Sequence, residues 1–174
     1  MVRRYRRRPI INRDKYSIEQ TLICTPACSE WPTVAADPDR GVQASKQYTE
    51  SIVPSVDTGG MRKVKHLTFS ICNNNAQGLG DLGTVLFAVV YVPSGYSPQD
   101  INYPALDHAI QMYDANQYVM ASGVLDMSAG PSRIRTPLSR NLNSGDTIYL
   151  ILATTDPGSA ISYTVEVQYA ITLQ

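Results

Sequence analysis

Five arginines lie among the first eight residues of the chain, in the segment MVRRYRRRPIINRDKY, and their chemistry suits phosphate. A guanidinium group donates hydrogen bonds from a planar fork that matches the oxygens of a phosphate group. A tyrosine ring within the same segment can stack on a base. We therefore predict a nucleic-acid contact at these residues: Arg3, Arg4, Tyr5, Arg6, Arg7, Arg8, Arg13 and Lys15.

The same arginine-rich run has two other interpretations. Short runs of lysine and arginine serve as nuclear localisation signals, and this use is compatible with nucleic-acid binding. The alternative is a solvated tail or a remnant of cloning, without a function of its own.

The net charge of zero hides an uneven distribution along the chain. Residues 1–15 carry seven basic side chains and one acidic side chain, which gives +6. The remaining residues carry eight basic and 14 acidic side chains, which gives −6. A basic arm on an acidic body indicates a polyanionic partner. We expect this arm, residues 1–15, to be flexible until it binds, because it has too little apolar surface to fold alone.

A second basic cluster, MRKVKH at 61–66, stands at the start of a predicted strand and contains Arg62, Lys63 and Lys65. Alternation along a strand would place Lys63 and Lys65 on the face that also carries the apolar row Leu67, Phe69 and Ile71. We therefore expect the cluster at the rim of a sheet. It is either a solvated edge that discourages aggregation or a continuation of the phosphate-binding surface.

Three further arginines, Arg133, Arg135 and Arg140, leave the same two interpretations open. They are spread along the chain and carry less weight than the compact cluster at 61–66.

The motif GLGDLG at 78–83 matches the spacing of a dinucleotide-binding fingerprint. That fingerprint works only when a helix follows, so that the helix N-terminus meets the pyrophosphate. The residues that follow, TVLFAVVYVP, are β-branched and aromatic and end in proline. We interpret the glycines as a turn between strands and predict no cofactor.

Cys24, Cys28, His66 and His108 can be drawn together as a zinc site, but a C-x3-C spacing without a second pair is a weak pattern. The chain has two histidines and lacks the nucleophile elbow, paired carboxylates and metalloprotease motif of common hydrolases. We predict neither a metal site nor an enzyme. Cys72 lies in an apolar run, where cysteine acts as a small hydrophobe, and we expect all three cysteines to be reduced.

The elements that carry these residues are predicted to be strands. The segment 161–174 alternates apolar and polar residues throughout, and the runs TVLFAVVYV and TIYLILA are nearly unbroken and predict central strands covered on both faces. Turns rich in glycine and proline separate eight predicted strands, and no long helix is evident. The predicted strands are 16–25, 46–53, 62–73, 84–92, 117–126, 132–138, 146–155 and 161–173.

Two long connections, 26–45 and 94–116, interrupt this pattern, the second with a possible short helix at 105–113. Loops of this length are usually functional surface. Trp31 and the eleven tyrosines are predicted as anchors for contacts between subunits. No apolar run is long enough to span a membrane, and no secretory signal peptide is expected.

Several stretches resemble the capsid proteins of small circular single-stranded DNA viruses, the circovirus-like viruses that encode a replication initiator and one coat protein. The similarity covers most of the chain and is weakest in 26–60 and 94–116. The stretches are RKVKHLTFSI, VLFAVVYVPSG, QYVMASGVLD, RIRTPLSRNLNSGDTIYLIL and YAITLQ.

The resemblance implies an all-β fold: a single eight-stranded antiparallel jelly roll of two four-stranded sheets, spanning 16–174, behind the basic arm. It implies self-assembly of about 60 copies into an icosahedral shell. The arm would lie inside the virion, contact the single-stranded viral DNA and engage the host nuclear import machinery. The loops 26–45, 74–83, 127–131 and 156–160 would gather near fivefold axes, and 94–116 would face a neighbour or the exterior.

This arm is shorter than that of many circovirus-like proteins. Sixty arms would supply about 360 positive charges, whereas a kilobase-scale genome carries on the order of a thousand phosphates. The shortfall favours Arg62, Lys63 and Lys65 as a second set of contacts. The rival functions are a cellular nucleic-acid-binding β-sandwich that does not assemble, and a jelly-roll module that binds a receptor or carbohydrate. The host receptor is not evident from the sequence.

Overall fold

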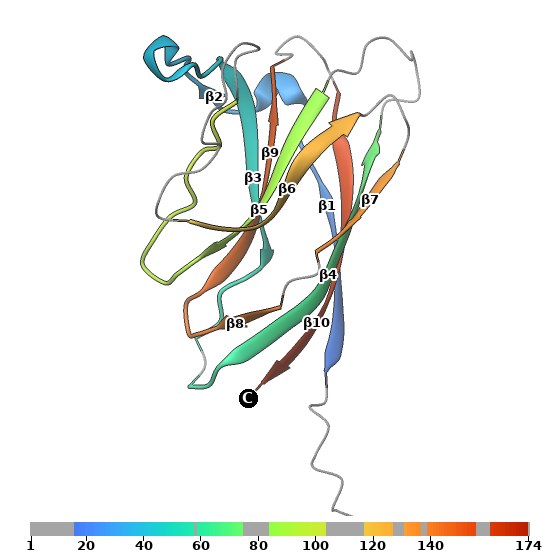
Figure 1. Cartoon of the computed structure of the whole chain (residues 1–174). Coiled ribbons are helices and arrows are strands. Elements are labelled where there is room, and N and C mark those ends of the chain that lie inside the picture. Colours follow the sequence, from blue (N-terminus) through green and yellow to red (C-terminus); the bar gives the residue numbers. More distant parts are fainter. Residues whose placement is uncertain are drawn as a thin grey trace, which may run out of the picture.

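A computed structural model describes residues 16–57, 59–74, 84–103, 117–126, 131–136, 139–155 and 161–173. Over these residues the chain forms ten strands in two five-stranded antiparallel sheets, with two 3-10 helices of three residues each (Figure 1). The arm, the GLGDLG motif and the predicted helix at 105–113 lie outside the described residues. Within the described ranges, no helix is long and apolar enough to cross a bilayer.

The first sheet, sheet A, has the strand order β1-β10-β4-β7, and β8 also pairs with β4. Its strands are β1 (Ser17–Cys24), β10 (Tyr163–Leu173), β4 (Arg62–Asn73), β7 (Ser132–Arg135) and β8 (Arg140–Leu142). β10 and β4 are central and are the longest strands of the sheet. They therefore provide the rigid platform on which the outward side chains of sheet A are displayed.

The second sheet, sheet B, has the strand order β2-β3-β9-β5-β6. Its strands are β2 (Thr33–Val34), β3 (Ser45–Val53), β9 (Thr147–Thr154), β5 (Thr84–Val92) and β6 (Tyr118–Asp126). Its central strands β5 and β9 are the two nearly unbroken apolar runs, as expected for strands covered on both faces.

The eight predicted strands correspond to β1, β3, β4, β5, β6, β7, β9 and β10, and they cross between the sheets with the connectivity of a jelly roll. The predicted count of eight strands in two four-stranded sheets is corrected, because the described residues contain ten strands in two five-stranded sheets. The two additional strands, β2 and β8, have two and three residues. Segments this short carry no readable period-two pattern.

The main core lies between the sheets and follows the predicted alternation. Tyr163, Val165, Val167 and Tyr169 of β10 are buried, and the residues between them are more exposed. Trp31 belongs to the same core, where it is 1 % exposed and its Nε1 donates to the Pro26 carbonyl at 3.0 Å. The prediction of Trp31 as a contact between subunits is therefore corrected, because its ring is buried in the core of its own chain and cannot contact a neighbour.

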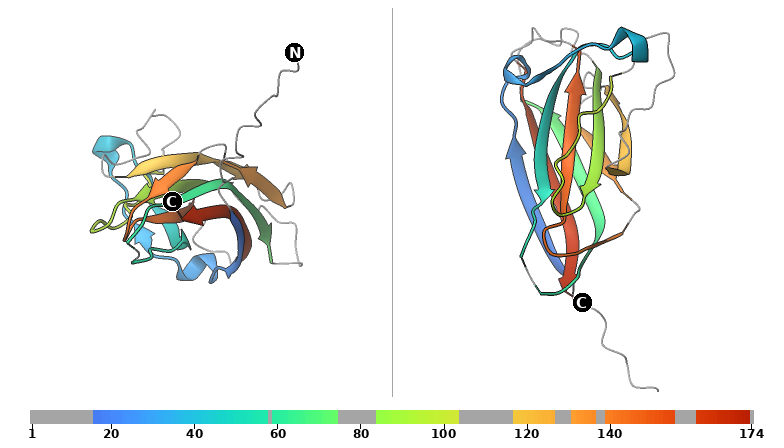
Figure 2. Two further views of the ribbon diagram at one scale, coloured as in Figure 1. Left: turned by 90° about the horizontal axis from the view of Figure 1, so that it is seen from below. Right: turned by 90° about the vertical axis from the view of Figure 1, so that its left-hand side faces the viewer.

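A smaller apolar layer covers the outward face of sheet B. Segment 93–103, which follows β5, packs Ile101 against Ala88, Val90, Ile151 and other buried residues of β5 and β9. In Figure 2 (right) this segment crosses in front of β9. The central strands β5 and β9 of sheet B are thus buried on both sides by residues of the same chain.

Hydrogen bonds tie both ends of this covering segment to the sheet. The Gln47 side chain of β3 accepts from the Ile101 amide at 3.0 Å and donates to its carbonyl. The Ser94 amide donates to the Asp146 carboxylate at 3.0 Å. Because these backbone groups are satisfied, the segment can lie over apolar side chains without leaving polar atoms unpaired.

The two ends of the sandwich differ in which connections they hold. At one end of the sandwich, β1 ends beside the start of β10, where Cys24 pairs with Thr164, and β5 begins beside the end of β6, where Thr84 pairs with Asp126. The strand ends at this end of the sandwich flank the connections 25–44, 74–83, 127–131 and 156–160. The start of β1 lies beside the end of β10 at the other end, where Ser17 pairs with Ile171 (Figure 2). Residues 1–15 precede Tyr16 directly, so the covalent chain attaches the arm at this second end.

Candidate nucleic-acid interface

A β-bulge at His66 decides which side chains sheet A shows to the outside. Lys65 pairs with Ala170 and Thr68 pairs with Gln168, so two residues of β4 stand opposite the single residue Tyr169. His66 has φ 55°, in the left-handed region that histidine enters more readily than most residues. The extra residue reverses the alternation of β4 between its two halves.

The predicted shared face of Lys63, Lys65 and the row Leu67, Phe69 and Ile71 is therefore wrong. Leu67, Phe69 and Ile71 point into the core, whereas Lys63 and Lys65 point outward. A regular strand would place the two sets together, and the bulge between them separates them. The lysines consequently stand on a continuous outward face and not at the edge of the apolar row.

Arg62 does not belong to this outward face. Its side chain is 4 % exposed, and its guanidinium donates to the carbonyls of Pro54 at 3.0 Å and Asp146 at 3.1 Å. The grouping of Arg62 with Lys63 and Lys65 as a nucleic-acid contact is corrected, because these structural hydrogen bonds hold it in the interior. Arg62 stands two residues before the buried Val64, so alternation along the strand could have indicated that Arg62 points inward.

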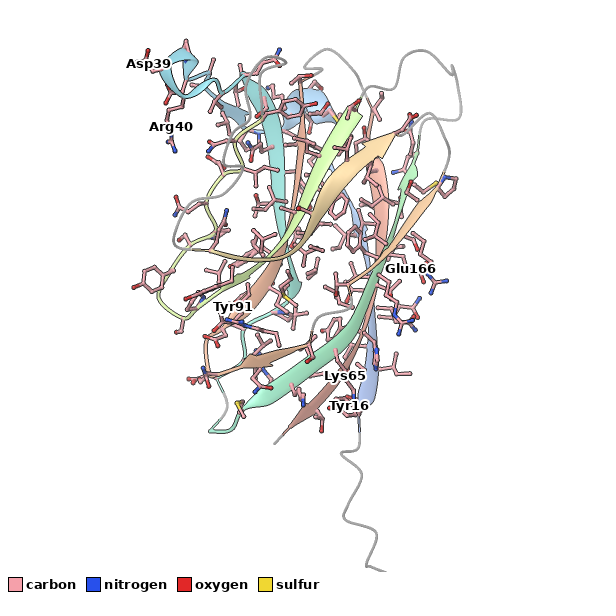
Figure 3. The ribbon with its side chains drawn as sticks, in the orientation of Figure 1. Tyr16, Asp39, Arg40, Lys65, Tyr91 and Glu166 are labelled. Atoms are coloured by element: carbon pink, nitrogen blue, oxygen red, sulfur yellow. The ribbon has the colours of Figure 1, made fainter. Side chains whose placement is uncertain are left out.

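Lys65 lies where the arm joins the body. Its Nζ is 3.4 Å from the centroid of the Tyr16 ring, a cation–π contact between β4 and the residue that precedes β1. Figure 3 shows Tyr16 and Lys65 together near the lower end of sheet A. Lys63 lies on the same face, opposite Thr172 of β10.

The structure brings Arg133 and Arg135 of β7 onto this face as well. Arg133 pairs with Ser70 of β4, Arg135 pairs with Thr68, and both side chains are exposed. We call the outward surface formed by Lys63, Lys65, His66, Arg133 and Arg135 the basic face.

Arg140 lies elsewhere, although the sequence left the same two interpretations open for it as for Arg133 and Arg135. Its guanidinium carbon is 4.1 Å from the Tyr91 ring centroid and 5.0 Å from the Tyr118 ring centroid. It therefore lies over two neighbouring rings of sheet B and is not part of the basic face.

An open groove of about 560 Å³ runs across the middle of the basic face. An Arg135 Nη donor lies 3.2 Å from His66 Nδ1 at its edge. Because a guanidinium can only donate, Nδ1 must be the acceptor in this contact. The groove is lined by Ile18, His66, Thr68, Arg133, Arg135, Gln168, Tyr169 and Ala170, a set without a carboxylate.

The electrostatics of this region favour an anion. Among the described residues of the outward face, Glu166 of β10 is the one acid, and it accepts a hydrogen bond from Gln20 Nε2 (Figure 3). Burial and the charge of Glu19 raise the pKa of Tyr169, against the smaller opposite effect of Arg62. The Tyr169 side chain is buried in the core, so the groove gains no negative charge from it.

The remaining predicted site residues divide into two groups. Arg3, Arg4, Tyr5, Arg6, Arg7, Arg8, Arg13 and Lys15 all lie outside the described residues. Of the cysteines, Cys28 is buried in the core, whereas Cys24 and Cys72 are exposed free thiols. Cys72 does lie in the predicted strand, but its side chain is not buried there as a small hydrophobe would be. Within the described ranges no group of three or more His, Cys, Asp or Glu side chains is placed to hold a metal.

No protein-family model matches the chain, and no curated protein matches it. One solved structure similar to it is titled Desmodium yellow mottle tymovirus. The similarity covers 98 % of this chain and 95 % of that chain, at 13 % sequence identity and a TM-score of 0.34. At this identity and TM-score the likeness assigns no function to the chain.

Proposed function

We propose that this chain is a viral coat protein that assembles into a closed shell and packages single-stranded DNA through its arginine-rich arm. The observation that carries the proposal is the joining of two parts: a jelly-roll body with a basic outward face, and an arm of charge +6 attached at the end of that face. In this proposal the chain has a structural role and no catalytic activity.

The body has the features that symmetric assembly needs. Its edge strands leave backbone groups unpaired, and a neighbouring copy can cover them. Leu22 of the edge strand β1 is 65 % exposed, which is unusual for a large apolar side chain. A shell of about 60 copies buries the same patches on every copy. The strand ends gathered at one end of the sandwich would then surround its fivefold axes.

The arm supplies the electrostatic contact with the genome. Flexible arginines bind phosphates without reading base edges, so packaging would tolerate any sequence. The same basic run serves nuclear import, which places the protein in the host nucleus during assembly and in the virion afterwards. These finer assignments follow the resemblance to circovirus-like capsid proteins.

Electron microscopy of the purified chain tests assembly, and nuclease treatment followed by an absorbance ratio tests packaging. We expect uniform shells of about 20 nm, given subunits of ordinary domain size. A variant that lacks residues 2–8 should still form shells but retain little protected nucleic acid.

Two results would contradict the proposal in different ways. A chain that stays monomeric or dimeric at all concentrations would favour a nucleic-acid-binding protein that does not assemble. Normal packaging by the truncated variant would show that the arm does not capture the genome.

A further inference from the structure

We propose that the basic face is a second binding site, a track for the sugar–phosphate backbone of one nucleic-acid strand, with Arg133 and Arg135 as its central phosphate contacts. The inference rests on the proposed function, because it names a further surface for the same polyanion. It assigns a role to two arginines that the sequence alone left undecided, and it excludes Arg62 and Arg140.

The cations form a row and not a cluster. Along β4, the row extends from Ser70, which pairs with Arg133, to Lys63. At about 3.3 Å per residue this distance is about 23 Å. A row of this length suits a polymer of charges, whereas a single phosphate or carboxylate ligand needs donors that converge on one point.

The row is continuous with the arm. Arg133 and Arg135 occupy the groove, Lys65 follows after the bulge, and its ammonium group contacts Tyr16, the first residue beyond the arm. A strand bound by the arm would therefore meet the track without a gap. This continuity addresses the charge shortfall of the arm, since each copy gains four more cations beside it.

The side chains on the track suit phosphates better than bases. The lining of the groove is mainly basic, polar or aliphatic: the Tyr169 side chain is buried, and the one exposed ring, the His66 imidazole, is paired with Arg135. Binding of single strands through bases uses exposed aromatic platforms. The track therefore recognises the backbone, which DNA and RNA share, and does not discriminate between base sequences.

A second copy of the chain is the rival occupant of this face, because Ile18 lines the groove and is exposed. Two copies that met through the same face would bring cation against cation, which opposes association. Charge complementarity thus favours a polyanion.

The test measures fluorescence anisotropy of labelled oligo(dT) and oligo(U), each of about 20 nucleotides, with the full chain at several salt concentrations. We expect the double variant Arg133→Gln, Arg135→Gln to bind both polymers about tenfold more weakly, since each exposed charge pair contributes up to about 1 kcal/mol. The slope of log affinity against log salt should fall by about 1.4, or 0.7 for each lost contact.

Two control variants isolate position from charge. Arg40→Gln removes one exposed cation at the opposite corner of the molecule, beside β2, and should leave affinity nearly unchanged, whereas Arg135→Gln alone should weaken it (Figure 3). The double variant Arg133→Lys, Arg135→Lys keeps both charges and should retain most of the affinity. Circular dichroism and light scattering verify that the variants remain folded and keep the oligomeric state of the natural chain.

The outcomes separate this inference from the proposed function. If the natural chain binds but Arg135→Gln equals Arg40→Gln, the track is wrong and packaging by the arm stands. If the chain without residues 2–8 still binds, and substitution of Arg133 and Arg135 abolishes that binding, the track is supported. The arm is then not the sole nucleic-acid contact. A loss confined to one polymer, or a changed oligomeric state in place of weaker binding, would overturn the track, and no binding at all would overturn both proposals.

Discussion

Sheet A and sheet B turn opposite faces to the outside of the sandwich, and the two faces are built from different residues. The outward face of sheet B is apolar over its central strands β5 and β9, which lie under segment 93–103 of the same chain. The outward face of sheet A is polar and basic and has no such cover from the described residues. One face has been closed by folding, and the other is open to a partner.

This difference places the covered apolar layer and the proposed binding surface on separate sides of the molecule. The cover over sheet B places the central strands β5 and β9 between two apolar layers, and burial of such apolar surface stabilises the fold. Substitutions on the open face of sheet A remove little buried surface. The basic face can therefore vary in charge without much effect on the free energy of unfolding.

The largest expected effect comes from truncating the cover of sheet B. Ile101→Ala removes a side chain that is 0 % exposed, and we expect a loss of about 2–5 kcal/mol in the free energy of unfolding. The matched substitution on sheet A is Ile18→Ala, for which we expect a change within about 0.5 kcal/mol. Urea denaturation of both variants, at concentrations where light scattering shows no assembly, provides the measurement. Equal losses would mean that the two faces do not differ in this way.

The next effect concerns the hydrogen bonds that anchor the cover at Ser94. The buried Asp146 carboxylate accepts from the Tyr91 hydroxyl at 2.7 Å, the Asn143 amide at 2.7 Å and the Ser94 amide at 3.0 Å. Burial tends to raise the pKa of Asp146, but these hydrogen bonds outweigh it and hold the pKa below its usual value. Burial and the bond to Asp146 raise the pKa of Tyr91, so its hydroxyl remains a donor.

The sign of the pH dependence follows from these shifts. Because the folded pKa of Asp146 lies below the unfolded value of about 3.9, ionised Asp146 adds stability above that pH and loses it as the pH falls through the folded pKa. We expect Asp146→Asn to cost about 1–3 kcal/mol at neutral pH, and the difference from the natural chain to shrink below about pH 4. Urea denaturation at several pH values measures it. A difference that stays constant down to pH 2 would contradict the role of the ionised carboxylate.

The smallest effect concerns the charge of the open face. Glu166→Gln removes the acid from the described part of that face while keeping the shape of the side chain, and should tighten oligo(dT) binding by about twofold, within the range of exposed charge pairs. Asp39→Asn changes the net charge by the same amount at the remote η2 helix (Pro38–Arg40) and serves as the matched control (Figure 3). If both variants tighten binding equally, net charge and not the basic face governs affinity.

Much of the fold could be predicted from the sequence, because alternation and turn residues are local signals. β4 and β5 begin and end at the predicted residues, and the alternation in β10 identifies the buried side chains from Tyr163 to Tyr169 correctly. It fails at Thr172, which was predicted on the wetter face and is buried. The two shortest strands escaped prediction since two or three residues show no period. The charge partition between arm and body needs only the positions of the charged residues along the chain.

The candidate site was less predictable, because it depends on contacts distant in sequence and on one local irregularity. Arg135 and His66 are 69 residues apart and meet only because β7 pairs with β4. The bulge at His66 separates Lys63 and Lys65 from the apolar row, and the position of the bulge could not be predicted from the single sequence.

By itself, the sequence determined where the strands lie, which chain segments are apolar on both sides, and that a basic arm precedes an acidic body. The tertiary structure decided which cations share a surface. It buried Arg62, stacked Arg140 on tyrosine rings, and aligned Lys63, Lys65, Arg133 and Arg135 on one open face. The physical reason is that strand propensity is local, whereas pairing register and burial are set by neighbours far along the chain.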